Sequence, residues 1–171
     1  YVGDINMKSL PMLYCDMDGV LADFKKAAEK VTGLPITQWQ NSTRKEKWNP
    51  IRNKRDFWET LPWTSDGKSL WNYIKKHNPH ILSAYVDRAV DPNCISGKTN
   101  WARRNLGLGP NRLALVKRSN KQHYAQTGYK SPAVLIDDYR PNVEQFTRRG
   151  GIGIHHTSAS NSIRELKKLG Y

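Results

Sequence analysis

Short apolar runs alternate with helical patterns along most of the chain. The apolar runs have the length of buried strands and cover residues 10–15, 80–84, 113–116, 133–136 and 151–155. Stretches of helical periodicity cover residues 23–32, 66–76, 96–106, 119–127, 141–149 and 160–169. Strands that alternate with helices predict an α/β fold, in which a parallel five-stranded sheet carries helices on both faces.

The ends of these helices carry recognisable signals. The glycines that close four of them are Gly33, Gly107, Gly128 and Gly150. Ser96 and Ser119 stand where an N-terminal cap is needed, because a serine hydroxyl can accept a hydrogen bond from the first helical turn. Pro141 fits the first position of the helix that follows it. We therefore expect three helices to begin at these residues.

A polar, basic segment at residues 34–62 interrupts the alternation and is rich in tryptophan. It contains Trp39, Trp48 and Trp58, and Trp63 lies just beyond it. These rings have two interpretations: they form the small core of an inserted unit, or some of them offer a flat surface to a ligand. Trp58 and Trp63 are the nearest to the expected junction between the insertion and the sheet.

The interrupted pattern predicts two units. Residues 25–63 are expected to form a small helical cap inserted after the first strand, and residues 7–24 and 64–171 are expected to form the core. Met7 is a candidate native start, so residues 1–6 are expected to be a tag or a disordered N-terminus. The first residues lack the apolar stretch of a secretion signal.

The composition adds a strong positive charge. The chain has 28 Lys and Arg against 15 Asp and Glu, which gives a net charge of +13. Such a field attracts phosphate-bearing partners, but it does not distinguish a nucleotide from a nucleic acid. No apolar run approaches the ~20 residues of a transmembrane helix, so we expect no membrane partner. Cys15 lies in a predicted buried strand, which argues against a disulfide with Cys94 and for a cytoplasmic location.

Polar side chains follow four of the predicted strands at the point where each strand ends. They are Asp16 and Asp18, then Ser83, then Lys117 and Lys121, and finally Asp137 and Asp138. Ligands of open parallel sheets bind outside the carboxyl ends of the strands, so we expect these side chains to converge. Crowded carboxylates need a counter-charge, and a set of oxygen ligands suits Mg²⁺. Gly19 permits a tight turn whose N–H groups can face an anion.

Other charged residues leave alternatives open. Lys117 lies nearer the end of its strand, whereas Lys121 fits the start of a helix, and we favour Lys121 as the lysine that faces phosphate. Lys98, at the start of a predicted helix, is either functional or a solvated surface lysine. His155 and His156 are adjacent in a predicted strand and point to opposite faces, so we do not expect them to share a metal.

Four segments carry the strand-end residues in a recognisable order. They are DMDGVLADF at residues 16–24, HILS ending at Ser83, SNKQHYA containing Lys121, and VLIDDYRPN at residues 134–142. Together they resemble the four motifs of the haloacid dehalogenase (HAD) superfamily in its phosphatase form. The sequence GGIGI at residues 150–154, after the fourth motif, resembles the 5′(3′)-deoxyribonucleotidase group within that superfamily.

The resemblance implies a role for each of these residues. Asp16 attacks phosphorus and becomes an aspartyl-phosphate, and Asp18 protonates the leaving oxygen and later activates water. Mg²⁺ is held by Asp16, the backbone carbonyl of Asp18, and Asp137, with Asp138 supporting the metal shell. The residues expected to contact the phosphate or the rest of the substrate are Gly19, Ser83, Ala84, Lys121 and Trp58.

The resemblance therefore implies a HAD-like Rossmannoid core with a small cap and a Mg²⁺-dependent phosphomonoesterase activity. The nucleotidase group favours nucleoside monophosphates, whereas the charge of +13 supports the alternative of a terminal phosphate on a nucleic acid. A binding module without turnover is disfavoured by the intact set of Asp16, Asp18, Lys121 and Asp137. Dehalogenases of this family need no acidic residue two positions after the nucleophile. The presence of Asp18 at that position therefore argues against dehalogenase chemistry.

Overall fold

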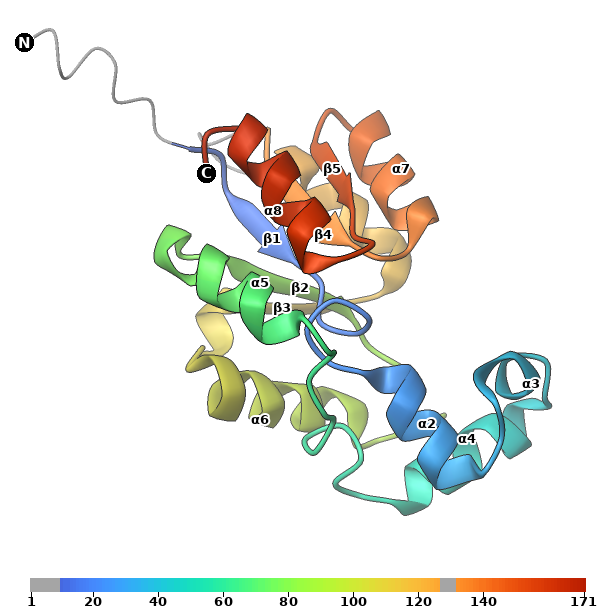
Figure 1. Ribbon diagram of the computed structural model, residues 1–171. Helices are drawn as coiled ribbons and strands as arrows, with labels where there is room; N and C mark the ends of the chain where they lie inside the picture. Colours follow the sequence, from blue (N-terminus) through green and yellow to red (C-terminus); the bar gives the residue numbers. More distant parts are fainter. Residues whose placement is uncertain (1–9, 127–131) are drawn as a thin grey trace, which may run out of the picture.

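The computed structural model describes residues 10–126 and 132–171, so Met7, the segment 1–6 and Gly128 lie outside the described residues. A central sheet is flanked by helices, and a further group of helices stands off one end of it (Figure 1). Among the described residues, none of the helices combines the length and the apolar character needed to cross a bilayer.

The sheet has five parallel strands. They are β1 (Leu13–Cys15), β2 (His80–Ala84), β3 (Leu113–Val116), β4 (Val134–Asp137) and β5 (Ile152–His155). Their spatial order is β3-β2-β1-β4-β5, which confirms the predicted five-stranded parallel sheet. β1 is central, because Cys15 pairs with Ile81 on one side and with Ile136 on the other. The residue that follows β1, Asp16, consequently lies at the middle of the carboxyl edge.

Helices cover both faces of the sheet. On one face lie α5 (Gly67–Ile74), α6 (Cys94–Leu106) and α8 (Ala159–Lys168), and on the other lie α7 (Arg140–Arg148) and the 3₁₀ helix η3 (Arg118–Gln126). Side chains alternate along β1, so Leu13 and Cys15 join the larger core while Tyr14 joins the smaller one. Two short 3₁₀ turns, η1 (Lys75–His77) and η2 (Pro110–Arg112), connect elements at the edges.

The segment between β1 and α5 is helical. It contains α2 (Phe24–Thr32), α3 (Ile36–Gln40) and α4 (Arg44–Asn53), which stand apart from the sheet in Figure 1. Thr43 and Glu46 form a capping box at the start of α4. The segment leaves and rejoins the core at one place, since Ala22 bridges to Trp63. This placement confirms the expected helical insertion after the first strand.

Several predicted element starts were wrong by a few residues. α6 begins at Cys94 rather than at Ser96, because the Asp91 carboxylate accepts a hydrogen bond from the Asn93 N–H and turns the chain earlier. The helix expected to start at Ser119 is the 3₁₀ helix η3, which already begins at Arg118. α7 begins one residue before Pro141. β1 is shorter than the apolar run that predicted it.

Candidate active site

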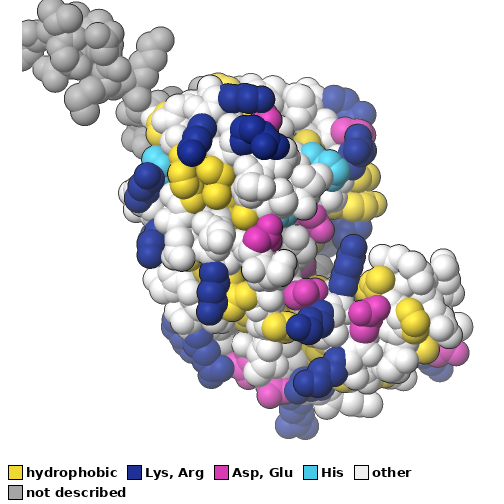
Figure 2. Space-filling model, in the orientation of Figure 1, with side chains coloured by type: hydrophobic (Ala, Val, Ile, Leu, Met, Phe, Trp, Pro, Cys, Tyr) yellow, Lys and Arg dark blue, Asp and Glu magenta, His cyan; other side chains and the backbone are white. Residues whose placement is uncertain are grey.

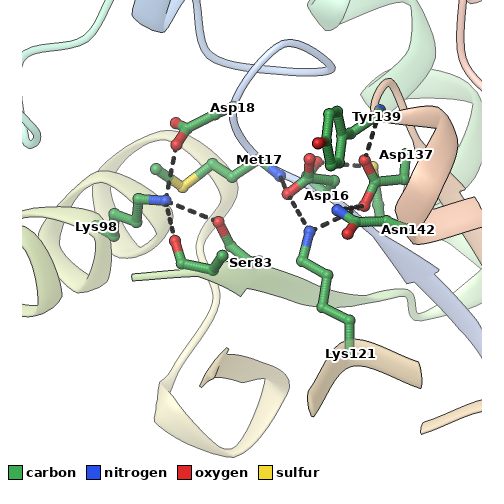
Figure 3. Close-up of polar contacts among 11 residues, drawn as sticks. Asp16, Met17, Asp18, Ser83, Lys98, Lys121, Asp137, Tyr139 and Asn142 are labelled. Atoms are coloured by element: carbon green, nitrogen blue, oxygen red, sulfur yellow. Dashed lines mark hydrogen bonds and ion pairs between the residues drawn. The ribbon is translucent and has the colours of Figure 1, made fainter. Parts of the chain in front are cut away.

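One cavity of about 590 Å³ at the carboxyl edge of the sheet is lined by Asp16, Asp18, Ser83, Lys121 and Asp138, whereas Asp137 is outside this lining. The sheet contributes Asp16, Ser83 and Ala84 to the lining, and the inserted segment contributes Phe24, Trp48 and other rings. Figure 3 shows that two lysines approach the site from different elements: Lys98 from α6 and Lys121 from η3. Lys117 is exposed and does not line the cavity, so the structure brings Lys121 and not Lys117 to the site.

The loop after β1 is a tight turn that permits close packing against the fourth motif. The N–H groups of Leu21 and Ala22 both donate to the Met17 carbonyl. Gly19 has a φ of +80°, and a Cβ on Gly19 would overlap the Asp138 carboxylate. A side chain here would therefore be strained and would also displace an acidic group of the site. This is the physical reason for glycine at this position.

Three carboxylates gather beside this loop. One oxygen of each of Asp16, Asp137 and Asp138 lies within 4.8 Å of the others. Burial, followed by the charge of Asp16, raises the pKa of Asp137 to about 6 and the pKa of Asp138 to about 7. Three carboxylate oxygens this close together have the composition of a cation site. The side chain of Asp18 points away from this group, toward Lys98 (Figure 3).

Lys121 is the buried cation of the carboxylate cluster. Its Nζ lies 2.9 Å from Asp16 Oδ1 and 2.9 Å from Asp137 Oδ2, and the residue is only 2% exposed. Burial alone would lower the pKa of Lys121, but the charges of Asp16 and Asp137 outweigh burial and raise it above its usual value. Lys121 therefore stays protonated at neutral pH. Asn142, which sequence reasoning did not single out, donates to Asp137 Oδ2 at 3.0 Å.

Lys98 is a second buried cation that the sequence left undecided. It is 1% exposed and donates to Asp18 Oδ2, Ser83 Oγ and the Ala84 carbonyl. Burial raises the pKa of Asp18, and the positive charge of Lys98 opposes this rise. A signal for Lys98 exists in the sequence, because it shares a helical stripe with the buried residues Cys94 and Trp101. A lysine in an apolar stripe indicates a buried and paired ammonium group.

Aromatic rings of the inserted segment form one wall of the cavity. Phe24 stacks on Trp58 with ring centroids 5.4 Å apart, and Trp39 packs edge-on against both Phe24 and Trp48. Trp58 is fixed by a 2.7 Å hydrogen bond from Nε1 to the Asp91 carboxylate. These rings pack together as the small core of the insertion and also line the cavity. Trp63 instead packs on Trp101, outside the cavity lining.

The mouth of the cavity carries basic and aromatic groups. Arg118 lies over the Tyr139 ring at 4.6 Å, and Tyr139 is 44% exposed. Lys25 and Lys47 line the same cavity from the insertion. Other Lys and Arg side chains are spread over both the core and the insertion on the face drawn in Figure 2. The positive charge is thus distributed over this face, with a few cations at the cavity itself.

The two adjacent histidines have separate partners. His155 Nε2 lies 3.0 Å from the Asp138 carbonyl oxygen. His156 is buried, and its Nδ1 lies 2.7 Å from the Ser162 hydroxyl. Both contacts tie β5 to neighbouring segments, and neither ring belongs to the carboxylate cluster.

No protein-family model matches the sequence, and no curated protein is significantly similar to it. Solved structures are similar in fold. A hydrolase from Streptococcus pneumoniae matches 94% of this chain and 100% of its own with a TM-score of 0.60 at 11% identity. A haloacid dehalogenase-like hydrolase from Xanthomonas campestris matches 96% of this chain and 93% of its own with a TM-score of 0.60 at 12% identity.

The L-2-haloacid dehalogenase from Xanthobacter autotrophicus matches 95% of this chain and 84% of its own, with a TM-score of 0.53 at 12% identity. At such low identities the similarity concerns the fold alone. The parallel sheet of order 3-2-1-4-5, with its helical insertion after the first strand, is therefore the fold of the HAD-like hydrolases.

Proposed function

We propose that this protein is a metal-dependent phosphomonoesterase that works through an aspartyl-phosphate on Asp16. The observation that carries the proposal is the placement of Asp16 at the centre of the sheet edge, between a buried lysine and two further carboxylates. Asp16 Oδ1 accepts hydrogen bonds from Lys121 and from the Met17 N–H. Oδ2 accepts none from the described residues, which leaves it as the oxygen that attacks phosphorus.

The carboxylate cluster fits a divalent cation. Three carboxylates gather within reach of one another while Asp16 and Asp137 share the single positive charge of Lys121, so the acidic groups of the cluster outnumber its ammonium group. Asp16, Asp137 and Asp138 would hold Mg²⁺, together with the backbone carbonyl of Asp18. When bound, the ion supplies positive charge beside the oxygens of the transferring phosphoryl group.

The remaining steps use side chains of the chain itself. Asp16 Oδ2 forms a bond to phosphorus while the bond from phosphorus to the leaving oxygen breaks, and the carboxyl group of Asp18 gives its proton to that oxygen. Asp18 then takes a proton from water, which attacks phosphorus and frees Asp16. The third N–H of Lys121 and the hydroxyl of Ser83 are the donors proposed for the phosphoryl oxygens.

A nucleoside monophosphate suits the rest of the cavity best. A volume of about 590 Å³ lies within the range of small-molecule sites, roughly 300–1,000 Å³. The half-buried rings of Phe24 and Trp48 on this wall offer surfaces against which a base can pack, and the buried Trp58 supports them from behind Phe24. Gln40 and Lys47, on the same wall, offer polar groups to the edge of a base.

One observation favours a second candidate, the terminal phosphate of a nucleic acid. Tyr139 and Arg118 stand at the mouth of the cavity, and an exposed aromatic ring beside an arginine is a common contact for single strands. Such a pair would contact a nucleotide that lies outside the cavity. We rank this candidate second, because the aromatic wall inside the cavity already accounts for a single base.

Dehalogenation is the remaining alternative, since a haloacid dehalogenase shares the fold. Loss of a halide ion requires no proton donor, whereas loss of an alcohol oxygen does. Asp18, half-buried at the cavity and held by Lys98, is the acid that phosphate ester cleavage requires.

A panel of phosphate monoesters, assayed with and without Mg²⁺, tests the proposal. It contains deoxynucleoside and ribonucleoside monophosphates, sugar phosphates without a base, and oligonucleotides phosphorylated at either end. We expect Mg²⁺-dependent release of phosphate, fastest from mononucleotides. Equal rates with sugar phosphates and nucleotides would refute the proposed substrate class, and no hydrolysis of any monoester would refute the proposed activity.

A further inference from the structure

Lys98 is a buried cation that connects three groups of the site. It reaches from α6 toward the carboxyl ends of β1 and β2, where its Nζ lies 2.7 Å from Asp18 Oδ2. The same atom lies 2.9 Å from Ser83 Oγ and 2.6 Å from the Ala84 carbonyl oxygen. The proposed reaction assigns functions to Asp18 and Ser83 but none to the lysine that joins them.

Counting protons separates the functions of the two buried lysines. An ammonium group carries three N–H donors, and Lys98 uses all three on Asp18, Ser83 and Ala84. Lys121 uses two, on Asp16 and Asp137, and keeps one for a ligand. Lys98 therefore has no donor left for a phosphate unless it gives up a bond to the protein. Its geometry is that of a residue that orients other side chains.

The bonds of Lys98 decide which polar atoms of Asp18 and Ser83 are already occupied by a protein partner. Ser83 Oγ accepts from Lys98, so its own O–H is directed elsewhere, and Ser83 lines the cavity. Asp18 Oδ2 is occupied by Lys98, which leaves Oδ1. Asp18 Oδ1 has no hydrogen-bond partner among the described residues, and it is buried beneath a side chain that is 29% exposed and lines the cavity. This oxygen is consequently the one free to carry a proton, which reaches the leaving group when the side chain turns toward the cavity.

Lys98 is itself held in place by the cavity wall. Its Nζ lies 5.3 Å from the centroid of the Trp58 ring. The preceding residue, Gly97, lets α6 approach closely, since a Cβ there would lie 2.5 Å from Trp58 Cβ. Asp91 fixes Trp58 by the hydrogen bond described above. The position of the ammonium group is thus fixed by the Trp58 ring, by the packing of α6 and by its three hydrogen-bond acceptors.

We propose that Lys98 is a positioning residue that holds Asp18 for proton transfer, and this inference rests on the proposed function. In the step concerned, Asp16 Oδ2 bonds to phosphorus, the bond from phosphorus to the leaving oxygen breaks, and the proton on Asp18 Oδ1 moves to that oxygen. Lys98 gains and loses no proton and makes no bond to the substrate.

Leaving groups of different basicity test this inference. Phenyl phosphate and p-nitrophenyl phosphate have almost the same shape, but the phenolate leaving group, with a conjugate-acid pKa of about 10, needs a proton far more than the nitrophenolate. We expect Lys98→Met to lower kcat at least tenfold more for phenyl phosphate and nucleoside monophosphates than for p-nitrophenyl phosphate. Lys75→Met, at an exposed position on the far side of the core, is the matched control and should leave both rates unchanged.

A double-mutant cycle with Asp18→Asn completes the test. If Lys98 acts through Asp18, then Lys98→Met in the Asp18→Asn background should lower the phenyl phosphate rate by less than threefold. Lys98→Gln, which keeps a donor, replaces Lys98→Met in both tests if the latter does not fold. Equal losses of kcat for the two aryl phosphates would overturn the inference, and so would fully additive effects of the two substitutions. In either case an active wild type would still support the proposed function. An inactive wild type would instead refute the proposed function.

Discussion

Lys121 Nζ lies 2.9 Å from Asp16 Oδ1, although the two residues are 105 positions apart in the chain. Asp16 follows β1 at the sheet edge, and Lys121 lies on η3, which follows β3, two strands away from β1 in the sheet. Both side chains are almost fully buried, so loss of either one leaves the other as a buried charge with fewer partners. This ion pair is therefore the contact on which the geometry of the carboxylate cluster depends.

The two candidate lysines of the third motif should differ sharply on substitution. Lys121→Ala should lower kcat by about 10²- to 10³-fold, the usual cost of removing a donor to a developing oxyanion in a dry site. Lys117 is exposed and outside the cavity, so Lys117→Ala should change kcat by less than twofold. Steady-state rates with a nucleoside monophosphate check both variants. The reverse ranking would assign the phosphate contact to Lys117.

The turn at Gly19 offers a substitution with a close control. Gly19→Ala forces an alanine to a φ of +80° and drives its Cβ into the Asp138 carboxylate. Gly33→Ala meets a similar φ of +73° but has no atom within 4 Å of the new Cβ. Both variants should lose roughly 1–2 kcal/mol of unfolding free energy from the left-handed backbone. Only Gly19→Ala should also lose turnover and Mg²⁺ affinity.

Denaturant unfolding and Mg²⁺ titration of the two glycine variants make this comparison. Equal loss of activity in both would mean that backbone strain, rather than the contact with Asp138, explains the glycine.

The carboxylate cluster predicts how stability depends on pH without metal. Asp137 and Asp138 have folded-state pKa values of about 6 and about 7. The unfolded value is about 3.9, so between roughly pH 4 and pH 7 the folded state binds more protons than the unfolded state. The contribution of these groups to stability therefore falls as pH rises through that window. Mg²⁺ binding requires the ionised carboxylates and should offset the loss.

Thermal melts at pH 5 and pH 8, with and without Mg²⁺, measure this effect. We expect the increase in Tm caused by Mg²⁺ to be larger at pH 8 than at pH 5. In Asp137→Asn the Mg²⁺-dependent increase should disappear at both pH values. An increase that is larger at pH 5 would contradict the assignment of the cluster as the metal site.

The aromatic wall should contribute to the recognition of the base. Trp48 is half-buried at the edge of the ring cluster, so Trp48→Leu removes a ring face with little damage to the core. Stacking of a base on a ring contributes about 1–3 kcal/mol, so KM for a nucleoside monophosphate should rise at least fivefold. KM for deoxyribose 5-phosphate, which has no base, should not change. Equal increases in KM for the two substrates would contradict a contact between the base and this wall.

Much of the fold could be predicted from sequence because parallel strands buried on both faces are continuous apolar runs. β2, whose three central residues are buried, was predicted with its observed bounds for this reason. β3 was also predicted with its observed bounds, although it is a half-buried strand at the edge of the sheet. The glycine that ends α6, Gly107, adopts the expected left-handed conformation. Helix starts were predicted less well, because the turn that begins α6 depends on Asp91, which lies outside the helix. A serine near the start of the helix, such as Ser96, gives no information about this hydrogen bond to Asp91.

The site was predicted in part for a related reason. Residues at the carboxyl end of a strand, or directly after it, must lie at the sheet edge. The positions of Asp16, which follows β1, and Asp137, the last residue of β4, therefore predict their place in the site. Lys98 is on a helix, and its inward direction depends on how α6 packs against Trp58. Asn142 stands in the fourth motif, but its bond to Asp137 depends on the start of α7. Polar residues whose direction is set by tertiary packing are therefore the ones that sequence reasoning left undecided.

Turnover by Asp16→Asn tests the central claim most directly. An amide cannot serve as the carboxylate nucleophile, so phosphate release from p-nitrophenyl phosphate in excess Mg²⁺ should fall by more than 10³-fold. A thermal melt should confirm that the variant is folded, since Lys121 keeps its bond to Asp137. Turnover within tenfold of the wild type, a difference of about 1.4 kcal/mol in barrier height, would contradict an aspartyl-phosphate on Asp16.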